Sequence, residues 1–271
     1  MATLSDKSAQ RVTLRKPIPR ATTLILGVSI WVIFFGAWKL AVVFEAVNLL
    51  LVPPPDQVLM TLFRLVSEGR FLGDIGISVL RVVGSFLGAC VVAVPLGILM
   101  GTFATAESFF NPFVSAWRYL PAPAFIPILL MWLGTGEGPK LALLFIGVVF
   151  FLITLIMDYT RQVRIELIET SLTLGASQRQ VLWTVIVPAV LPNVVVAMRQ
   201  MLAVSWTYLV IAEIVASTTG IGAMMMRARR FLHTDEIMAG IVVIGILGLL
   251  FDLLFRWLHR GLFGYLYNNG R

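Results

Sequence analysis

The sequence predicts an all-α polytopic membrane protein with six transmembrane helices. Of its 271 residues, 59% are hydrophobic and only 13% are charged, and the mean hydropathy is +0.92. A soluble domain carries charge on about a quarter of its residues. The apolar residues also gather in runs of about 20, the length of a helix that crosses a bilayer. The basic residues mostly flank these runs, as the positive-inside rule requires for orientation in a membrane.

The net charge and the cysteine content exclude two other classes of function. A formal charge of +7 would suggest nucleic-acid binding in a soluble protein, but here membrane orientation explains it. The single cysteine, Cys90, lies within an apolar run, so neither an intrachain disulfide nor a cysteine metal cluster is predicted. His233 and His259 are isolated from each other and from Cys90, so we expect no metal site.

The first 75 residues contain a polar tail, one span and a short surface helix. Residues 1–22 carry five basic residues and are typical of a cytoplasmic tail. The apolar run of about 23–43 lacks a small-residue cleavage site, which indicates a retained helix rather than a signal peptide. After Pro53–Pro55, the apolar stripe of residues 58–66 predicts a short helix on the outer surface.

Five further spans follow. The second, about 76–101, contains Gly84-x-x-x-Gly88 and Gly97-x-x-x-Gly101, a spacing that lets helix backbones approach closely. The third contains four prolines, so its broken backbone should be buried in protein or line a cavity. The expected bounds of the third to sixth spans are about 112–133, 141–159, 191–214 and 237–258.

The segment Glu169–Pro188 is the longest polar segment between two spans, and it predicts two short helices joined by a turn. Gly175 occupies the position after the first helix where a left-handed residue closes a helix. Ser177 with Gln180 three residues later forms a capping box, which starts the second helix. We expect Pro188 to end that helix where the next apolar run begins.

The distribution of basic residues predicts which side each loop faces. With the N-terminus inside, 11 basic residues are cytoplasmic and six are external, so both termini and the Glu169–Pro188 segment are placed in the cytoplasm. Arg227, Arg229 and Arg230 are external exceptions. They form either a solvated surface or a contact for an acidic partner or anion.

The register of this segment resembles a known motif. Glu169 is followed by Gly175 six residues on and by Pro188 thirteen further on, which is similar to the EAA loop of ABC-importer permeases. The other motif positions hold Thr170 and Ser171 in place of two alanines, and Val185 and Val187 in place of Ile and Leu.

Motifs outside the loop extend the resemblance over about residues 45–260. Pro53–Pro55 before an amphipathic helix, Phe125-Ile126-Pro127 and Ala212-Glu213 leading to Gly220-Ile221-Gly222 resemble the nitrate/sulfonate/bicarbonate (taurine-type) permeases. The resemblance implies a type I ABC importer permease fold, a bacterial inner-membrane location and two permease copies around the pathway. It also implies an external binding protein that delivers a small anion (nitrate, bicarbonate or a sulfonate such as taurine).

The resemblance further implies that the loop docks in a groove on a cytosolic ATPase. The residues it assigns to docking are Glu169, Thr170, Ser171, Gly175, Ala176, Ser177, Val185 and Pro188. The sequence has no nucleotide-binding loop, so we expect no enzymatic activity and no cofactor in this chain, with ATP and Mg on the partner ATPase.

Charged residues inside spans are costly and indicate functional positions. Arg199, Trp206 and Glu213 recur every seven residues, so they lie on one stripe of the fifth span. We expect this stripe to face the bundle interior, with Arg199 near a translocation pathway and Glu213 near the external gate. A structural ion pair or an end-of-span position is the alternative.

The resulting organisation is a tail over residues 1–22, a six-span domain over 23–260 with a coupling loop at 160–188, and a cytoplasmic tail over 261–271. A secondary transporter or another polytopic membrane protein remains an alternative. A secondary transporter would show related halves, and a membrane enzyme would need a nucleophile–base pair or paired metal ligands. Both alternatives leave the Glu169–Pro188 segment unexplained.

Overall fold

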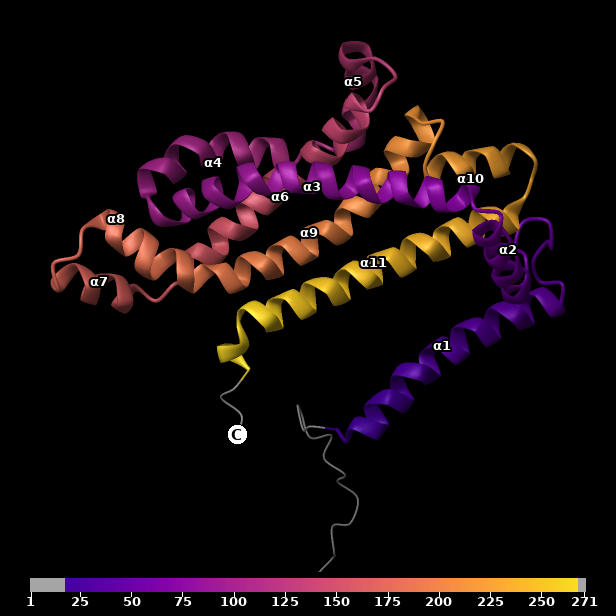
Figure 1. Ribbon diagram of the computed structural model, residues 1–271, viewed down its shortest axis with the longest axis horizontal. Helices are drawn as coiled ribbons and strands as arrows, with labels where there is room; N and C mark the ends of the chain where they lie inside the picture. Colours follow the sequence, from indigo (N-terminus) through magenta and orange to yellow (C-terminus); the bar gives the residue numbers. More distant parts are fainter. Residues whose placement is uncertain (1–17, 268–271) are drawn as a thin grey trace, which may run out of the picture. The chain divides into compact units, whose positions relative to one another are not determined.

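The computed structural model describes residues 18–267, and these form two compact units that divide after Asp56 (Figure 1). All regular elements of the described residues are helices. Most of the predicted N-terminal tail and the last four residues of the C-terminal tail lie outside the described residues. Five described helices are long and apolar enough to cross a membrane, and a bent pair makes a sixth span if it counts as one.

The first unit is built around α1 (Arg20–Val43), which contains the predicted first span. Its apolar side chains are nearly all exposed, and they surround the helix on all sides. The rings of Trp31, Phe35 and Trp38 stack along one side, with centroids about 6 Å apart. A helix that is apolar on every side and little buried is typical of contact with lipid.

The second unit holds the remaining spans. In Figure 1, α3, α6, α9 and α11 lie lengthwise, with α7 and α8 at one end and α10 at the other. Most buried side chains of its core come from α3, α6 and α9, among them Ala93, Leu152 and Leu209. The helices are α2 (Pro55–Ser67, in this unit from Gln57 on), α3 (Arg70–Thr102), α4 (Ala104–Arg118), α5 (Ile126–Leu133), α6 (Gly138–Arg161), α7 (Ile165–Thr173), α8 (Gln178–Val181), α9 (Val187–Ala216), α10 (Ile221–Arg230) and α11 (Thr234–Leu262).

Only one of the two predicted glycine pairs allows a close approach between helices. A Cβ atom at Gly97 would lie 2.8 Å from Cβ of Ile156, and one at Gly101 would lie 2.7 Å from the carbonyl oxygen of Met157, so α3 and α6 touch there. A Cβ at Gly84 meets nothing within 4 Å. The close approach of α3 to α6 therefore depends on the second pair.

Gly101→Val should destabilise the folded protein by about 1–3 kcal/mol, because the new side chain has no space between α3 and α6. The measurement is unfolding of the purified chain in detergent. Gly84→Val is the matched control and should change stability by less than about 0.5 kcal/mol. Equal losses in both variants would contradict this account of the contact.

The third span differs from the prediction. Instead of one segment starting near residue 112, α4 begins at Ala104, and α4 and the following segment Ala122–Leu133 are bent by 84° at residues 119–121. Pro121 explains the break, because proline lacks an N–H and disfavours helical backbone at the residue before it. A turn of 3₁₀ helix, Ala122–Phe125, leads into α5.

The loop between α6 and α9 contains the two predicted helices, α7 and α8, and the turn between them. Gly175 has φ +88°, the left-handed conformation expected after the first helix. The capping box is confirmed, because Ser177 Oγ accepts a hydrogen bond from the Gln180 backbone N–H and Gln180 Oε1 accepts one from the Ser177 N–H at 2.8 Å.

The prediction that Pro188 ends the second helix is wrong. The chain continues from α8 through a π-helical segment, Leu182–Ile186, directly into α9. The N–H of Val187 bonds to the carbonyl of Leu182, five residues back, and this wider turn accommodates the proline ring that would otherwise crowd the preceding carbonyl. The loop and the fifth span are therefore one continuous helical element.

Candidate functional site

The coupling-loop surface, formed by α7 and the turn to α8, projects at one end of the second unit (Figure 1). No residue of α7 is buried. Leu174 in the turn is 82% exposed, and Ile165 of α7 is 56% exposed. The Glu169 side chain is also exposed and has no hydrogen-bond or ion-pair partner among the described residues. Apolar side chains and a carboxylate without a described partner thus lie on a surface that residues 18–267 leave uncovered.

The rest of the loop anchors this surface to the bundle. Val181 and Ile186 are buried, so the start of the continuous helix packs against the core. The hydroxyl of Ser171 donates to the Leu167 carbonyl at 2.8 Å within α7. Of the predicted docking residues, Glu169, Thr170, Gly175, Ser177 and Pro188 are exposed, while Ser171, Ala176 and Val185 are half-buried.

At the other end of the unit, Glu213 of α9 is fully buried within a hydrogen-bond network. Its Oε1 accepts hydrogen bonds from Arg81 Nη1 and from Ser78 Oγ, both at 2.7 Å, and its Oε2 accepts one from the Gly222 N–H at 2.9 Å. A buried carboxylate needs such partners, because an unpaired charge there would be very costly.

Arg81 of α3 is the centre of this network and was not identified from the sequence. Its Nε and Nη2 bind both oxygens of Glu137, at 2.6 and 2.7 Å, and its Nη1 also donates to the Thr219 carbonyl at 2.8 Å. The guanidinium holds the pKa of Glu137 down at about 2, so this carboxylate stays ionised at neutral pH. Arg81 is a charged residue inside the predicted second span, and this signal could have identified it.

The turn before α10 packs directly on this network. Gly220 has φ +104°, and a Cβ atom there would collide with the Glu213 carboxylate. A Cβ at Gly222 would lie 2.7 Å from Cβ of Glu213. The Gly220 N–H donates to Asp74 Oδ1 at 2.6 Å. Glu213 and Asp74 thus hold the loop between α9 and α10 against α3.

The three arginines of α10 divide into two kinds. Arg227 forms an ion pair with Asp74 at 2.7 Å and donates to the Thr218 carbonyl at 2.7 Å, so it helps to fix the same loop. Arg229 and Arg230 are exposed and form no ion pair with the described residues.

The other members of the predicted stripe face α11. Arg199 Nε lies 3.2 Å from Asp252 Oδ1, and Arg256 of α11 binds the other oxygen of Asp252 at 2.7 Å. Trp206 is buried against Phe251, and its Nε1 has no hydrogen-bond partner among the described residues. Trp206 and Asp252 line an open cavity of about 670 Å³ that α9 and α11 form with Met225 of α10.

Within residues 18–267 no three His, Cys, Asp or Glu side chains are grouped as metal ligands would be. Three features are therefore candidates for function: the coupling-loop surface, the buried charge network around Glu213, and the open cavity between α9 and α11, which is called the groove below.

Comparison with known proteins assigns the chain to a family. Residues 93–264 match the model of the binding-protein-dependent transport system inner membrane component. The chain belongs to this family. This result confirms the ABC-importer permease that the Glu169–Pro188 register predicted, and the family is one of transport permeases.

Two relatives match the permease over nearly its whole length. It is 32% identical to the taurine transport system permease protein TauC of Escherichia coli, over 94% of each chain. It is 28% identical to an aliphatic sulfonates transport permease protein, SsuC, of Bacillus subtilis, over 94% of this chain and 93% of the relative.

A solved structure confirms the fold. The permease superposes on a chain of the MetNI methionine ABC transporter in an inward-facing conformation with a TM-score of 0.64. The match covers 71% of this chain and 95% of the other, at 19% sequence identity. The predicted type I importer fold is therefore confirmed.

Proposed function

We propose that the permease forms, together with a second copy, the translocation pathway of an ATP-driven importer for a small anion. The anion would be nitrate, bicarbonate or a sulfonate such as taurine, delivered by an external binding protein. The observation that carries this proposal is the exposed, capped and anchored coupling-loop surface. A secondary transporter has no need for such a surface.

Coupling would work through docking of the coupling-loop surface on a cytosolic ATPase. Leu174 offers an apolar contact for a groove, and Glu169 offers a charge-assisted hydrogen bond to a donor on the partner. Because α8 continues through the π segment into α9, a movement of the docked loop would pass directly to the fifth span. ATP and Mg would be bound by the ATPase, and this chain would carry no cofactor.

The solute would pass along the groove between α9 and α11. Trp206 lines the open cavity, and Arg199 supplies a positive charge next to Asp252, which lines the same cavity. A guanidinium group is suited to an oxyanion. Glu213 would act at the external gate by holding the loop before α10 in place.

The names of the relatives support an anionic solute, because taurine and aliphatic sulfonates both carry a sulfonate group. The net charge of +7 favours an anion as well. We further propose that Arg229 and Arg230 contact an acidic surface of the external binding protein, while Arg227 positions them through its bond to Asp74.

The permease would lie in the bacterial inner membrane with both termini in the cytoplasm. Residues 1–22 and 261–271 would be cytoplasmic tails, and 23–260 would form the six-span domain with its coupling loop at 160–188.

The proposal is tested by reconstituting the permease in liposomes with its ATPase subunits and binding protein. Uptake of labelled taurine, nitrate or bicarbonate is expected only with ATP and all components present. The permease alone should hydrolyse no ATP. Ion-driven uptake by the permease alone would contradict the proposal and favour a secondary transporter.

A further inference from the structure

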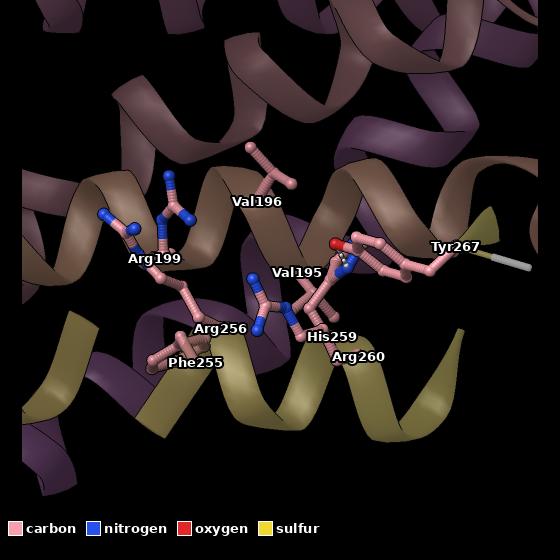
Figure 2. A pocket seen from close by; sticks show the side chains of 8 residues that line it. All are labelled: Val195, Val196, Arg199, Phe255, Arg256, His259, Arg260 and Tyr267. Atoms are coloured by element: carbon pink, nitrogen blue, oxygen red, sulfur yellow. Dashed lines mark hydrogen bonds between the residues drawn. The ribbon is translucent and has the colours of Figure 1, made fainter. Parts of the chain in front are cut away.

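A second cavity, here called the basic pocket, lies between α9 and α11 on the coupling-loop side of Asp252 (Figure 2). Its volume is about 180 Å³. Sites for drug-sized ligands have about 300–1,000 Å³, so this pocket suits a small group. The lining residues are Val195, Val196, Arg199, Phe255, Arg256, His259, Arg260 and Tyr267.

Positive charge exceeds negative charge in the basic pocket. Three guanidinium groups line it, and Asp252 is the one carboxylate that pairs with any of them among the described residues. Arg199 and Arg256 both bind Asp252 through Nε, which leaves the Nη groups of each without a described partner. Arg260 has no described carboxylate partner at all. The pocket therefore offers several guanidinium N–H donors without a described partner, together with an excess of positive charge.

The C-terminal end of the described chain builds one side of the basic pocket. After α11 the chain turns through Gly264–Leu266, which brings Tyr267 back to the helix. The Tyr267 hydroxyl lies 3.0 Å from His259 Nδ1, and the Arg260 guanidinium lies 5.8 Å from the centre of the tyrosine ring. Figure 2 shows this contact at one end of the pocket. Arginine side chains that simply extend to the membrane surface need no such contact, so the position of Tyr267 beside Arg260 favours a formed pocket.

The spacing along α11 places three charged side chains at different depths of the span, with Asp252 the deepest. Asp252, Arg256 and Arg260 follow one another at intervals of four residues, so they lie on one face about 6 Å apart. Arg260 is two residues from the end of α11 at Leu262, and Arg199 reaches Asp252 two turns deeper. The pocket thus runs from the helix end, where headgroups and solvent meet, into the span.

We propose that the basic pocket binds an oxyanion, a phosphate or a sulfonate, through the Nη groups of Arg199, Arg256 and Arg260. Guanidinium groups match the geometry of such anions with paired N–H donors. The anion can come from two sources: the headgroup of an anionic phospholipid or a free oxyanion in solution. The inference rests on the charges of the pocket and not on the proposed transport function.

The test uses the full-length permease in detergent and the variant Arg260→Gln, because Arg260 has no described ion pair whose loss would disturb the fold. The control is Arg164→Gln, which removes an exposed arginine near the start of α7, outside the pocket. Affinity for inorganic phosphate and for methanesulfonate is measured by titration, and retained phosphatidylglycerol is measured by native mass spectrometry.

Arg260→Gln should weaken binding about tenfold, the effect of one charged hydrogen bond, while Arg164→Gln should leave it unchanged. A loss confined to phosphate and methanesulfonate would identify a free oxyanion as the ligand, and a loss confined to phosphatidylglycerol would identify a lipid headgroup. If the wild-type protein binds neither, or if the two variants behave alike, the proposal is overturned. Transport is not measured, so this result is independent of the test of function.

Discussion

Arg81→Met should destabilise the permease by about 3–5 kcal/mol, because it leaves the fully buried Glu213 carboxylate without its cation. The hydrogen bonds from Ser78 and Gly222 would remain, but neither neutralises the charge. Glu137, which is half exposed, would be hydrated and add little to the loss. The measurement is thermal or denaturant unfolding of the purified permease in detergent.

The double variant Arg81→Met/Glu213→Gln separates loss of the ion pair from loss of packing. Removing both charges should recover most of the stability, because the buried carboxylate is then gone. Arg229→Gln, which removes an exposed arginine of α10, should change stability by less than about 0.5 kcal/mol. A double variant no more stable than Arg81→Met would show that the charge pair is not the cause.

Glu169→Lys should abolish ATP-driven uptake while the permease still inserts and folds. The side chain is exposed and has no described partner within the chain, so folding does not depend on it. Loss of a charge-assisted bond alone would weaken docking by about 1.5–3 kcal/mol, and the reversed charge adds repulsion. Uptake in liposomes and co-purification of the ATPase subunits are the two measurements.

Gly175→Pro tests the same surface through the backbone. Proline requires φ near −65°, whereas Gly175 has φ +88°, so the turn between α7 and α8 could not keep its shape. Uptake should be lost here too. Glu68→Lys, an exposed charge reversal after α2, is the control and should retain uptake and bound ATPase. Normal uptake in both Glu169→Lys and Gly175→Pro would refute docking through this surface.

Much of the coupling loop could be predicted because its determinants are local. The capping box joins residues three apart, and the left-handed glycine responds to the helix just before it. The prediction for Pro188 is wrong because the effect of a proline on a helix also depends on the backbone around it. A proline usually ends or kinks a helix, and only the backbone shows the π segment that lets the helix continue.

The two glycine pairs show that a spacing pattern by itself does not predict a helix–helix contact. Gly84 with Gly88 and Gly97 with Gly101 have the same spacing in the same helix. Only the second pair allows a close approach to α6, whereas a Cβ at Gly88 would just reach Phe145 at 4.0 Å and one at Gly84 would meet nothing within 4 Å. Spacing describes one face of a helix, and the neighbour on that face is set by the whole bundle.

The sequence by itself determined the number of apolar runs, the capped coupling loop and the importance of a charge such as Glu213, because each depends on neighbouring residues or on the cost of burial. The tertiary structure alone decided which charges meet. Arg81 and Glu213 are 132 residues apart, and Arg199 reaches Asp252 on another helix. A charge in a span requires a partner, but its identity depends on how helices pack, and packing is a property of the assembled bundle.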